Sequence, residues 1–236
     1  MGNKSGTRAK AMDKVVRVAD QVNMIMRHIP YVQTNFVLGL DSDVGSEPFE
    51  LTKRFLDLAP GAFPAYSLLS AFGRAAPLNL EYQRTGRVLP FPFHFLNNCQ
   101  AMNVRPKNYE WRDFYDHVVD LSRYSFTWRA IARRFGATKA AIPRWMNLVR
   151  AMSSEGFGRI AYHAMIRGLL DTDRDVRGFM EGETQELPEF YAYRIRRELG
   201  QLYGLLPDGA LMHDHTAYLR SEETGPLARA ANAFVA

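Results

Sequence analysis

Two short apolar runs, separated by a stretch with helical spacing, constrain the fold of this chain more than any other feature. The first run, residues 31–40, is rich in β-branched and aromatic residues, with apolar side chains at odd and even positions, as in buried strands of parallel sheets. The second run covers residues 65–70. Between them, residues 47–58 have helical spacing behind an expected N-cap at Ser46. This order predicts a βαβ unit with a right-handed crossover.

Helical patterns flank this unit on both sides. We expect one helix over residues 9–28, ended by Pro30, and another over residues 77–85. Further helices are expected at residues 142–152, 157–170, 175–181 and 188–206. Two parallel strands leave two open edges and are not a stable sheet by themselves, so the sequence predicts that they form one end of a larger sheet.

The composition is that of an ordinary globular protein. The 236 residues are 47% hydrophobic and 23% charged, which excludes a wholly disordered or fibrous chain. The single cysteine, Cys99, excludes a disulfide framework and an all-cysteine metal site within this chain. No apolar run approaches the ~20 residues that span a bilayer, and the N-terminal residues lack the apolar stretch of a signal peptide. We therefore expect a cytoplasmic protein with no membrane contact.

Several segments resemble one family. Residues 32–43, which read Val-Gln-Thr-Asn-Phe-Val-Leu-Gly-Leu-Asp-Ser-Asp, and residues 47–55 resemble the fifth strand and following helix of radical S-adenosylmethionine (radical SAM) enzymes. The similarity is closest to the branch that often carries an N-terminal cobalamin-binding domain. Residues 70–78 resemble that family's sixth strand and the turn after it, residues 86–89 its "GRIL" helix end, and residues 103–107 its "RPK" segment.

The resemblance implies a fold class and a domain organisation. Residues 1–106 would be an α/β partial domain, the last βα units of a truncated radical SAM TIM-like barrel. Residues 107–221 would form an α-helical C-terminal domain, and residues 222–236 a flexible tail. Because the chain begins after the point that matches the family's fourth strand, we expect the C-terminal half of such an enzyme. A separate N-terminal half or a neighbouring chain would then complete the barrel.

The implied chemistry is reductive cleavage of S-adenosylmethionine at a [4Fe–4S] cluster, which yields a 5′-deoxyadenosyl radical that abstracts hydrogen from a small-molecule substrate. The family holds the cluster with three cysteines in the pattern C-x-x-x-C-x-x-C, which this sequence lacks. We therefore expect this chain to hold no metal and to be inactive without the cluster-binding half, and we assign no catalytic residue. Cobalamin is a further cofactor that the branch suggests.

Six residues occupy positions at which the family contacts the S-adenosyl group. They are Asn35, Val37, Gly39, Asp41, Leu69 and Ser70. In the family's motif G-x-I-x-G-x-x-E, Val37 stands for the isoleucine that packs against the adenine, whereas Asn35 replaces a glycine and Ser42 the glutamate. From the residues alone, we favour Val37 as a core side chain, Gly39 as a turn glycine and Asp43 as a residue that shapes the turn; the family resemblance makes adenosine contact by Val37 and Gly39 an equal alternative.

A second hypothesis, from a different functional class, comes from the basic stretch Arg123–Arg150. It contains seven arginines and lysines, no acidic residue, and the interleaved aromatics Tyr124, Trp128 and Trp145. Phosphate contacts with aromatic stacking hold single-stranded nucleic acid, so the chain could be a non-catalytic helical module that binds RNA or a protein partner. We favour the alternative, in which the aromatics face inward and the arginines are solvated or ion-paired, so nucleic acid is not our first expectation.

Two other segments carry side chains able to bind ligands. Residues 91–100 combine aromatic, amide and imidazole groups that could line a substrate pocket, or could form a loop that packs on the C-terminal region. His213 and His215 are metal-ligand residue types, but two histidines do not make a zinc site.

Overall fold

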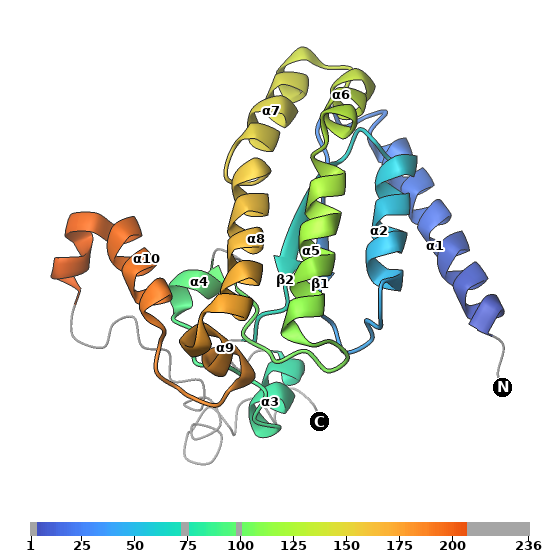
Figure 1. Ribbon diagram of the computed structural model, residues 1–236. Coiled ribbons are helices and arrows are strands. Elements are labelled where there is room, and N and C mark those ends of the chain that lie inside the picture. Colours follow the sequence, from blue (N-terminus) through green and yellow to red (C-terminus); the bar gives the residue numbers. More distant parts are fainter. Residues whose placement is uncertain (1–3, 72–75, 98–100, 207–236) are drawn as a thin grey trace, which may run out of the picture. The chain divides into compact units, whose positions relative to one another are not determined.

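The computed structural model describes residues 4–71, 76–97 and 101–206 (Figure 1). Within these residues the fold is mainly helical, with one sheet of two parallel strands. The chain divides into two compact units. Unit 1 comprises Met1–Ser67 and Lys107–Thr172, and unit 2 comprises Leu68–Pro106 and Asp173–Ala236.

The expectation of a truncated TIM-like barrel is wrong. The two strands pair with each other, and the described residues contain no further βα units of a barrel. Outside these two strands, the described residues contain one isolated antiparallel bridge, between Val88 and Val104. The misleading signal is the apolar content of the first run. Its side chains alternate in burial, and Val37 is 45% exposed, so this strand is not buried on both faces.

Unit 1 contains the βαβ unit and most of the long helices. Its elements are α1 (Lys4–Ile25), β1 (Gln33–Leu38), α2 (Glu47–Leu58), β2 (Phe63–Leu68, ending at the unit boundary), α5 (Trp111–Ser125), α6 (Trp128–Ala137), α7 (Ala141–Met152) and α8 (Phe157–Thr172). The order β1, α2, β2 confirms the strand–helix–strand prediction. Ser46 occupies the N-cap position of α2, although its side chain makes no capping hydrogen bond.

One face of the sheet packs on helices. The ring of Phe36 on β1 lies 5.3 Å from that of Phe55 on α2 and 5.9 Å from that of Tyr66 on β2. The Tyr66 hydroxyl lies 2.5 Å from Ser125 Oγ on α5, which itself donates to a backbone carbonyl, so Tyr66 is the donor. α1 adds a second layer, because the buried Ala19 packs with Phe55. On this face of β1, Thr34 and Phe36 are half-buried and Leu38 is buried.

Unit 2 is built from short helices around an aromatic cluster. Its elements are α3 (Pro77–Arg84), α4 (Phe93–Asn97), α9 (Arg174–Glu181), α10 (Glu189–Leu199) and a 3₁₀ helix (Gly200–Leu205). Phe91, Phe95, Phe179 and Tyr191 are fully buried, and their edge-to-face contacts have centroid separations of 4.9–6.2 Å. The described part of the 91–100 segment therefore packs against the C-terminal region, as its alternative interpretation predicted.

Candidate functional site

The second face of the sheet carries the residues that the family resemblance selects. Asn35 and Val37 follow each other at alternate positions of β1, and both side chains are exposed. The Asn35 amide and the Ser67 hydroxyl on β2 form a pair of hydrogen bonds of 3.0 and 3.1 Å. An apolar side chain therefore lies beside a polar pair near the carboxyl end of β1, a location that favours ligands in parallel sheets.

The loop after β1 is fixed by a buried carboxylate. Asp43 Oδ2 accepts hydrogen bonds from the backbone N–H groups of Gly39 (3.1 Å) and Leu40 (3.0 Å). Gly39 has φ +90°, which a side chain would strain. Burial raises the pKa of Asp43 above its usual value, although these hydrogen bonds oppose that rise. Asp43 therefore shapes the turn, as its residue type predicted.

Residues just before α5 hold the same loop from the other side. Asn108 Nδ2 donates to the carbonyls of Asp41 and Asp43, both at 2.9 Å. The Tyr109 hydroxyl donates to the Gly45 carbonyl at 2.8 Å. Burial, with a contribution from the charge of Asp43, raises the pKa of Tyr109 to about 12. These contacts preorganise the carboxyl end of β1, and no sequence pattern indicated Asn108 or Tyr109.

The remaining two expected residues lie in unit 2. Leu69 is buried, and Ser70 Oγ donates to the carbonyls of Leu68 and Ala101, both at 3.1 Å. The structure therefore brings together four of the six residues, namely Asn35, Val37, Gly39 and Asp41, in one strand and its loop.

The residues of this chain do not fit an iron–sulfur cluster. The sequence has one cysteine where the family's cluster needs three. Within residues 4–71, 76–97 and 101–206, no group of three or more His, Cys, Asp and Glu side chains could hold a metal ion. Cys99, His213 and His215 lie outside the described residues.

The basic stretch Arg123–Arg150 divides into structural and exposed cations. Arg134 is 4% exposed, and Arg144 Nε donates to the Thr138 carbonyl at 3.0 Å. Arg150 bonds to Glu155 and stacks 4.2 Å from the centre of the Phe63 ring. The exposed basic side chains with no hydrogen-bond or ion-pair partner among the described residues are Arg123, Arg129 and Lys139.

The tryptophans of this stretch do not follow the favoured interpretation. The side chain of Trp128 is 67% exposed and that of Trp145 is 59% exposed, although Trp145 still makes an edge contact with Phe135. The expectation that the aromatics face inward is therefore wrong for both indoles.

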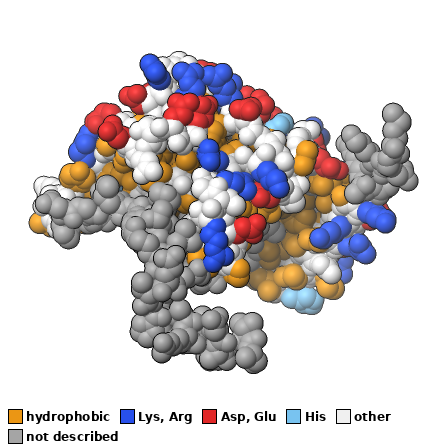
Figure 2. All heavy atoms as spheres, turned by 90° about the horizontal axis from the view of Figure 1, so that it is seen from below, with side chains coloured by type: hydrophobic (Ala, Val, Ile, Leu, Met, Phe, Trp, Pro, Cys, Tyr) orange, Lys and Arg blue, Asp and Glu red, His pale blue; other side chains and the backbone are white. Residues whose placement is uncertain are grey.

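Basic and acidic side chains are interspersed with apolar ones on the face shown in Figure 2.

An arginine-lined hollow lies where α2 meets the start of α6. Its volume is about 650 Å³, and its lining includes Arg54, Asp57, Arg129, Arg133 and Arg134. The last three belong to the basic stretch Arg123–Arg150, but Arg54 and Asp57 lie about 75 residues earlier. Only the packing of α2 against α5, and the ion pair between Asp57 on α2 and Arg133 on α6, bring the two segments together.

No family model, curated protein or solved structure matches this chain. The resemblance to radical SAM enzymes therefore rests only on the sequence segments quoted for it. In the part of the chain that the structure describes, no helix has both the length and the apolar character to cross a membrane.

Proposed function

We propose that this chain is the C-terminal portion of a radical SAM enzyme and contributes an adenosine-contacting strand, β1. The observation that carries this proposal is the exposed side chain of Val37 at the position where the family packs an aliphatic residue on the adenine. The proposal does not need the partial barrel that the structure contradicts. It needs an accessible β1 face, and the exposure of Asn35 and Val37 is consistent with that.

Each residue of this strand has a separate role in the proposal. Val37 supplies an apolar contact to one face of the adenine. The Asn35 amide carries two donors and an acceptor, which can pair with ring nitrogens after exchange of its bond to Ser67. Gly39 allows the chain to turn, and the Asp43 carboxylate keeps that turn in one conformation before a ligand arrives.

The cluster-dependent cleavage itself lies outside this chain in the proposal. Because the residues present do not fit a [4Fe–4S] cluster, we derive no step through it. We propose a small-molecule substrate, and cobalamin as a further cofactor, for the complete enzyme and not for this chain alone.

Binding of the adenosine group tests the proposal directly. The probes are S-adenosylmethionine and 5′-deoxyadenosine, with guanosine as a test of base specificity. Saturation-transfer NMR on the full chain detects the binding of each. We expect a signal from both adenosine compounds and its loss in Val37→Asp, because a carboxylate cannot pack on the ring. Val44→Asp is the matched control, since Val44 is 62% exposed in the loop after β1 and has no assigned contact.

Two results would contradict the proposal. One is the absence of any adenosine signal at millimolar ligand. The other is equal loss of signal in Val37→Asp and Val44→Asp, which would show that no particular contact at position 37 is involved.

A second candidate function, RNA binding through Arg123–Arg150, is favoured by the exposure of both indoles. Stacking on an aromatic side chain is worth about 1–3 kcal/mol per base. We therefore expect Trp128→Ala with Trp145→Ala to weaken binding of a uridine 12-mer in fluorescence anisotropy, and salt to weaken it in the parent chain. Tyr193→Ala, an exposed aromatic of unit 2, is the control. Unchanged affinity in the double variant would exclude this function.

A further inference from the structure

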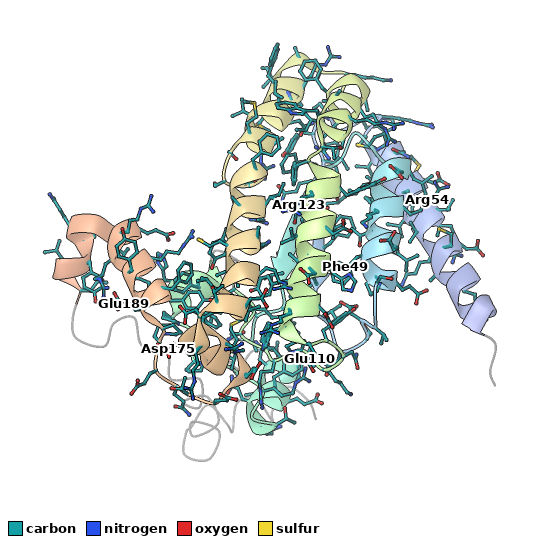
Figure 3. The ribbon with its side chains drawn as sticks, in the orientation of Figure 1. Phe49, Arg54, Glu110, Arg123, Asp175 and Glu189 are labelled. Carbon is teal, nitrogen blue, oxygen red and sulfur yellow. The ribbon has the colours of Figure 1, made fainter. Side chains whose placement is uncertain are left out.

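The arginine-lined hollow concentrates positive charge in unit 1. Its lining includes four arginines and a single aspartate, a net charge of three positive. Arg54 projects from α2, while Arg129, Arg133 and Arg134 lie on α6, with Arg129 and Arg133 four residues apart. Figure 3 shows Arg54 on α2, with Arg123 on the neighbouring α5. Arg54 and Arg129 have no hydrogen-bond partner among the described residues.

The one lining acid, Asp57, neutralises only part of this charge. It accepts hydrogen bonds from Arg133 Nη1 and from the Tyr124 hydroxyl, both at 2.8 Å. Burial alone would raise the pKa of Asp57, but these hydrogen bonds, together with the positive charges of Arg133 and Arg54, outweigh it and hold the pKa below its usual value. Asp57 therefore stays ionised and forms an ion pair with Arg133. The charge of Arg54 also acts on this carboxylate, so Arg129 and Arg134 are the lining arginines left without an acidic partner among the described residues.

Arg134, which also lines the hollow, is a second and independent observation. It is 4% exposed, and its Nε and Nη2 groups donate to the carbonyls of Ala62 (3.3 Å) and Ser125 (3.2 Å). Its Nη1 group is buried and has no hydrogen-bond partner. The guanidinium also lies over the rings of Phe63 and Phe126, at 5.5 and 5.6 Å from their centres.

An unpaired buried cation is costly, because burial removes it from water and no carboxylate replaces the lost solvation. The same burial lowers the pKa of Arg134 to about 10, so the guanidinium remains charged at neutral pH. A bound anion in the adjoining hollow would offset this cost. Exposed arginines at the rim would complete the charge-assisted contacts, for which the guanidinium fork suits phosphate oxygens.

We propose that the hollow formed by Arg54, Arg129, Arg133 and Arg134 binds a phosphate-bearing anion with at least two negative charges. Tyr124 and Thr127 also line it, but the Tyr124 hydroxyl donates to Asp57 and Thr127 Oγ1 caps α6, so the arginines supply the contacts to the anion. A volume of about 650 Å³ accommodates a diphosphate group with room for part of an attached organic group. None of the residues selected for adenosine contact lines this hollow, so the site is separate from the proposed function.

Isothermal titration of the full chain with inorganic pyrophosphate tests the proposal, with sulfate as a simple dianion and ATP as a nucleotide source of the same chemistry. The main variant is Arg54→Gln with Arg129→Gln, because both side chains are exposed and their removal leaves the core intact. We expect this variant to weaken pyrophosphate binding by at least about tenfold. Arg17→Gln with Arg123→Gln removes the same charge from exposed positions outside the hollow and should leave the affinity within about twofold.

The buried arginine is tested by thermal unfolding. Arg134→Met keeps an apolar stem of similar length, and we expect it to abolish the rise in melting temperature that pyrophosphate gives the parent chain. If Arg134→Met does not fold, the titration of the Arg54→Gln/Arg129→Gln variant with pyrophosphate still tests the proposal. Val37→Asp should leave pyrophosphate binding unchanged, so failure of the adenosine proposal and failure of this one give different results.

Three outcomes would overturn the proposal. The first is no pyrophosphate binding at millimolar concentration. The second is equal weakening in the hollow variant and the control variant, which would mean that only net charge matters. The third is binding of a uridine 12-mer that depends on Arg54 and Arg129 without any binding of pyrophosphate or ATP, which would assign the hollow to a polynucleotide. Tighter binding of ATP than of pyrophosphate would support a nucleotide as the source of the phosphate.

Discussion

Acidification below pH 6.5 should destabilise unit 1 through one residue, His163. This side chain lies on α8, is 1% exposed, and sits among the rings of Tyr115 and Tyr162 at centroid distances of 6.0 and 5.7 Å. Neither ring nitrogen has a hydrogen-bond partner. Burial, with the nearby positive charge of Arg159, lowers the pKa of His163 to about 3. The folded protein therefore holds this imidazole neutral.

The direction of the effect follows from proton linkage. Well above pH 6.5 the imidazole is neutral in both states, so His163 adds no pH dependence there. Between pH 6.5 and about 3, His163 is protonated in the unfolded chain but stays neutral in the folded chain. The free energy of unfolding therefore decreases as the pH falls. The loss reaches about 2 kcal/mol at pH 5 and about 5 kcal/mol below pH 3, at 1.36 kcal/mol per pKa unit.

Tryptophan fluorescence provides an assay that reports on unit 1 alone. All three tryptophans, Trp111, Trp128 and Trp145, belong to that unit. Urea unfolding followed by fluorescence at pH 8 and pH 5 gives the free energy of unfolding at each pH. In His163→Phe, which keeps an aromatic ring of similar size, we expect the difference between the two pH values to shrink by about 2 kcal/mol.

The control is His28→Gln, since His28 is exposed and its removal should leave the pH dependence unchanged. If His163→Phe and the parent chain lose the same stability between pH 8 and pH 5, the reasoning is refuted, because the acid sensitivity then arises from other groups.

Three further substitutions test single contacts by urea unfolding. Asn103→Ala should destabilise unit 2 by about 2–3 kcal/mol, because the buried Asn103 side chain pairs with both the N–H (2.7 Å) and the carbonyl (2.8 Å) of Ala71; far-UV circular dichroism measures it, and unchanged stability would contradict it. Gly182→Ala should cost about 1 kcal/mol, since this C-cap has φ +78°, and the same measurement applies. Asp43→Ala should cost about 2 kcal/mol by fluorescence, because two backbone N–H groups lose their acceptor, whereas Ser42→Ala should cost less.

Local patterns predicted the elements well because they depend on nearby residues. The helical spacing of residues 157–170 matches α8, and that of residues 142–152 matches α7 within one residue. The single predicted helix over residues 188–206 differs. Gly200, with φ +53°, ends α10 and a 3₁₀ helix follows, a break that apolar spacing alone did not show.

The same patterns overestimated the sheet. An apolar run on both faces is typical of a strand buried in a larger parallel sheet, and β1 has that composition. Its burial nevertheless alternates, because α2 and α5 cover one face and Val37 on the other remains exposed. Composition records which side chains could be buried, but coverage depends on which elements pack there.

For the candidate sites, the sequence by itself determined the residue types, the strand that presents Asn35 and Val37, and the presence of a basic stretch without acids. The tertiary structure alone decided that Arg134 is buried while Arg129, five positions before it, is exposed, and that α2 contributes Arg54 and Asp57 to the same hollow. The physical reason is that local spacing fixes the backbone and the apolar face of each helix, whereas burial and charge pairing depend on contacts between segments far apart in the chain.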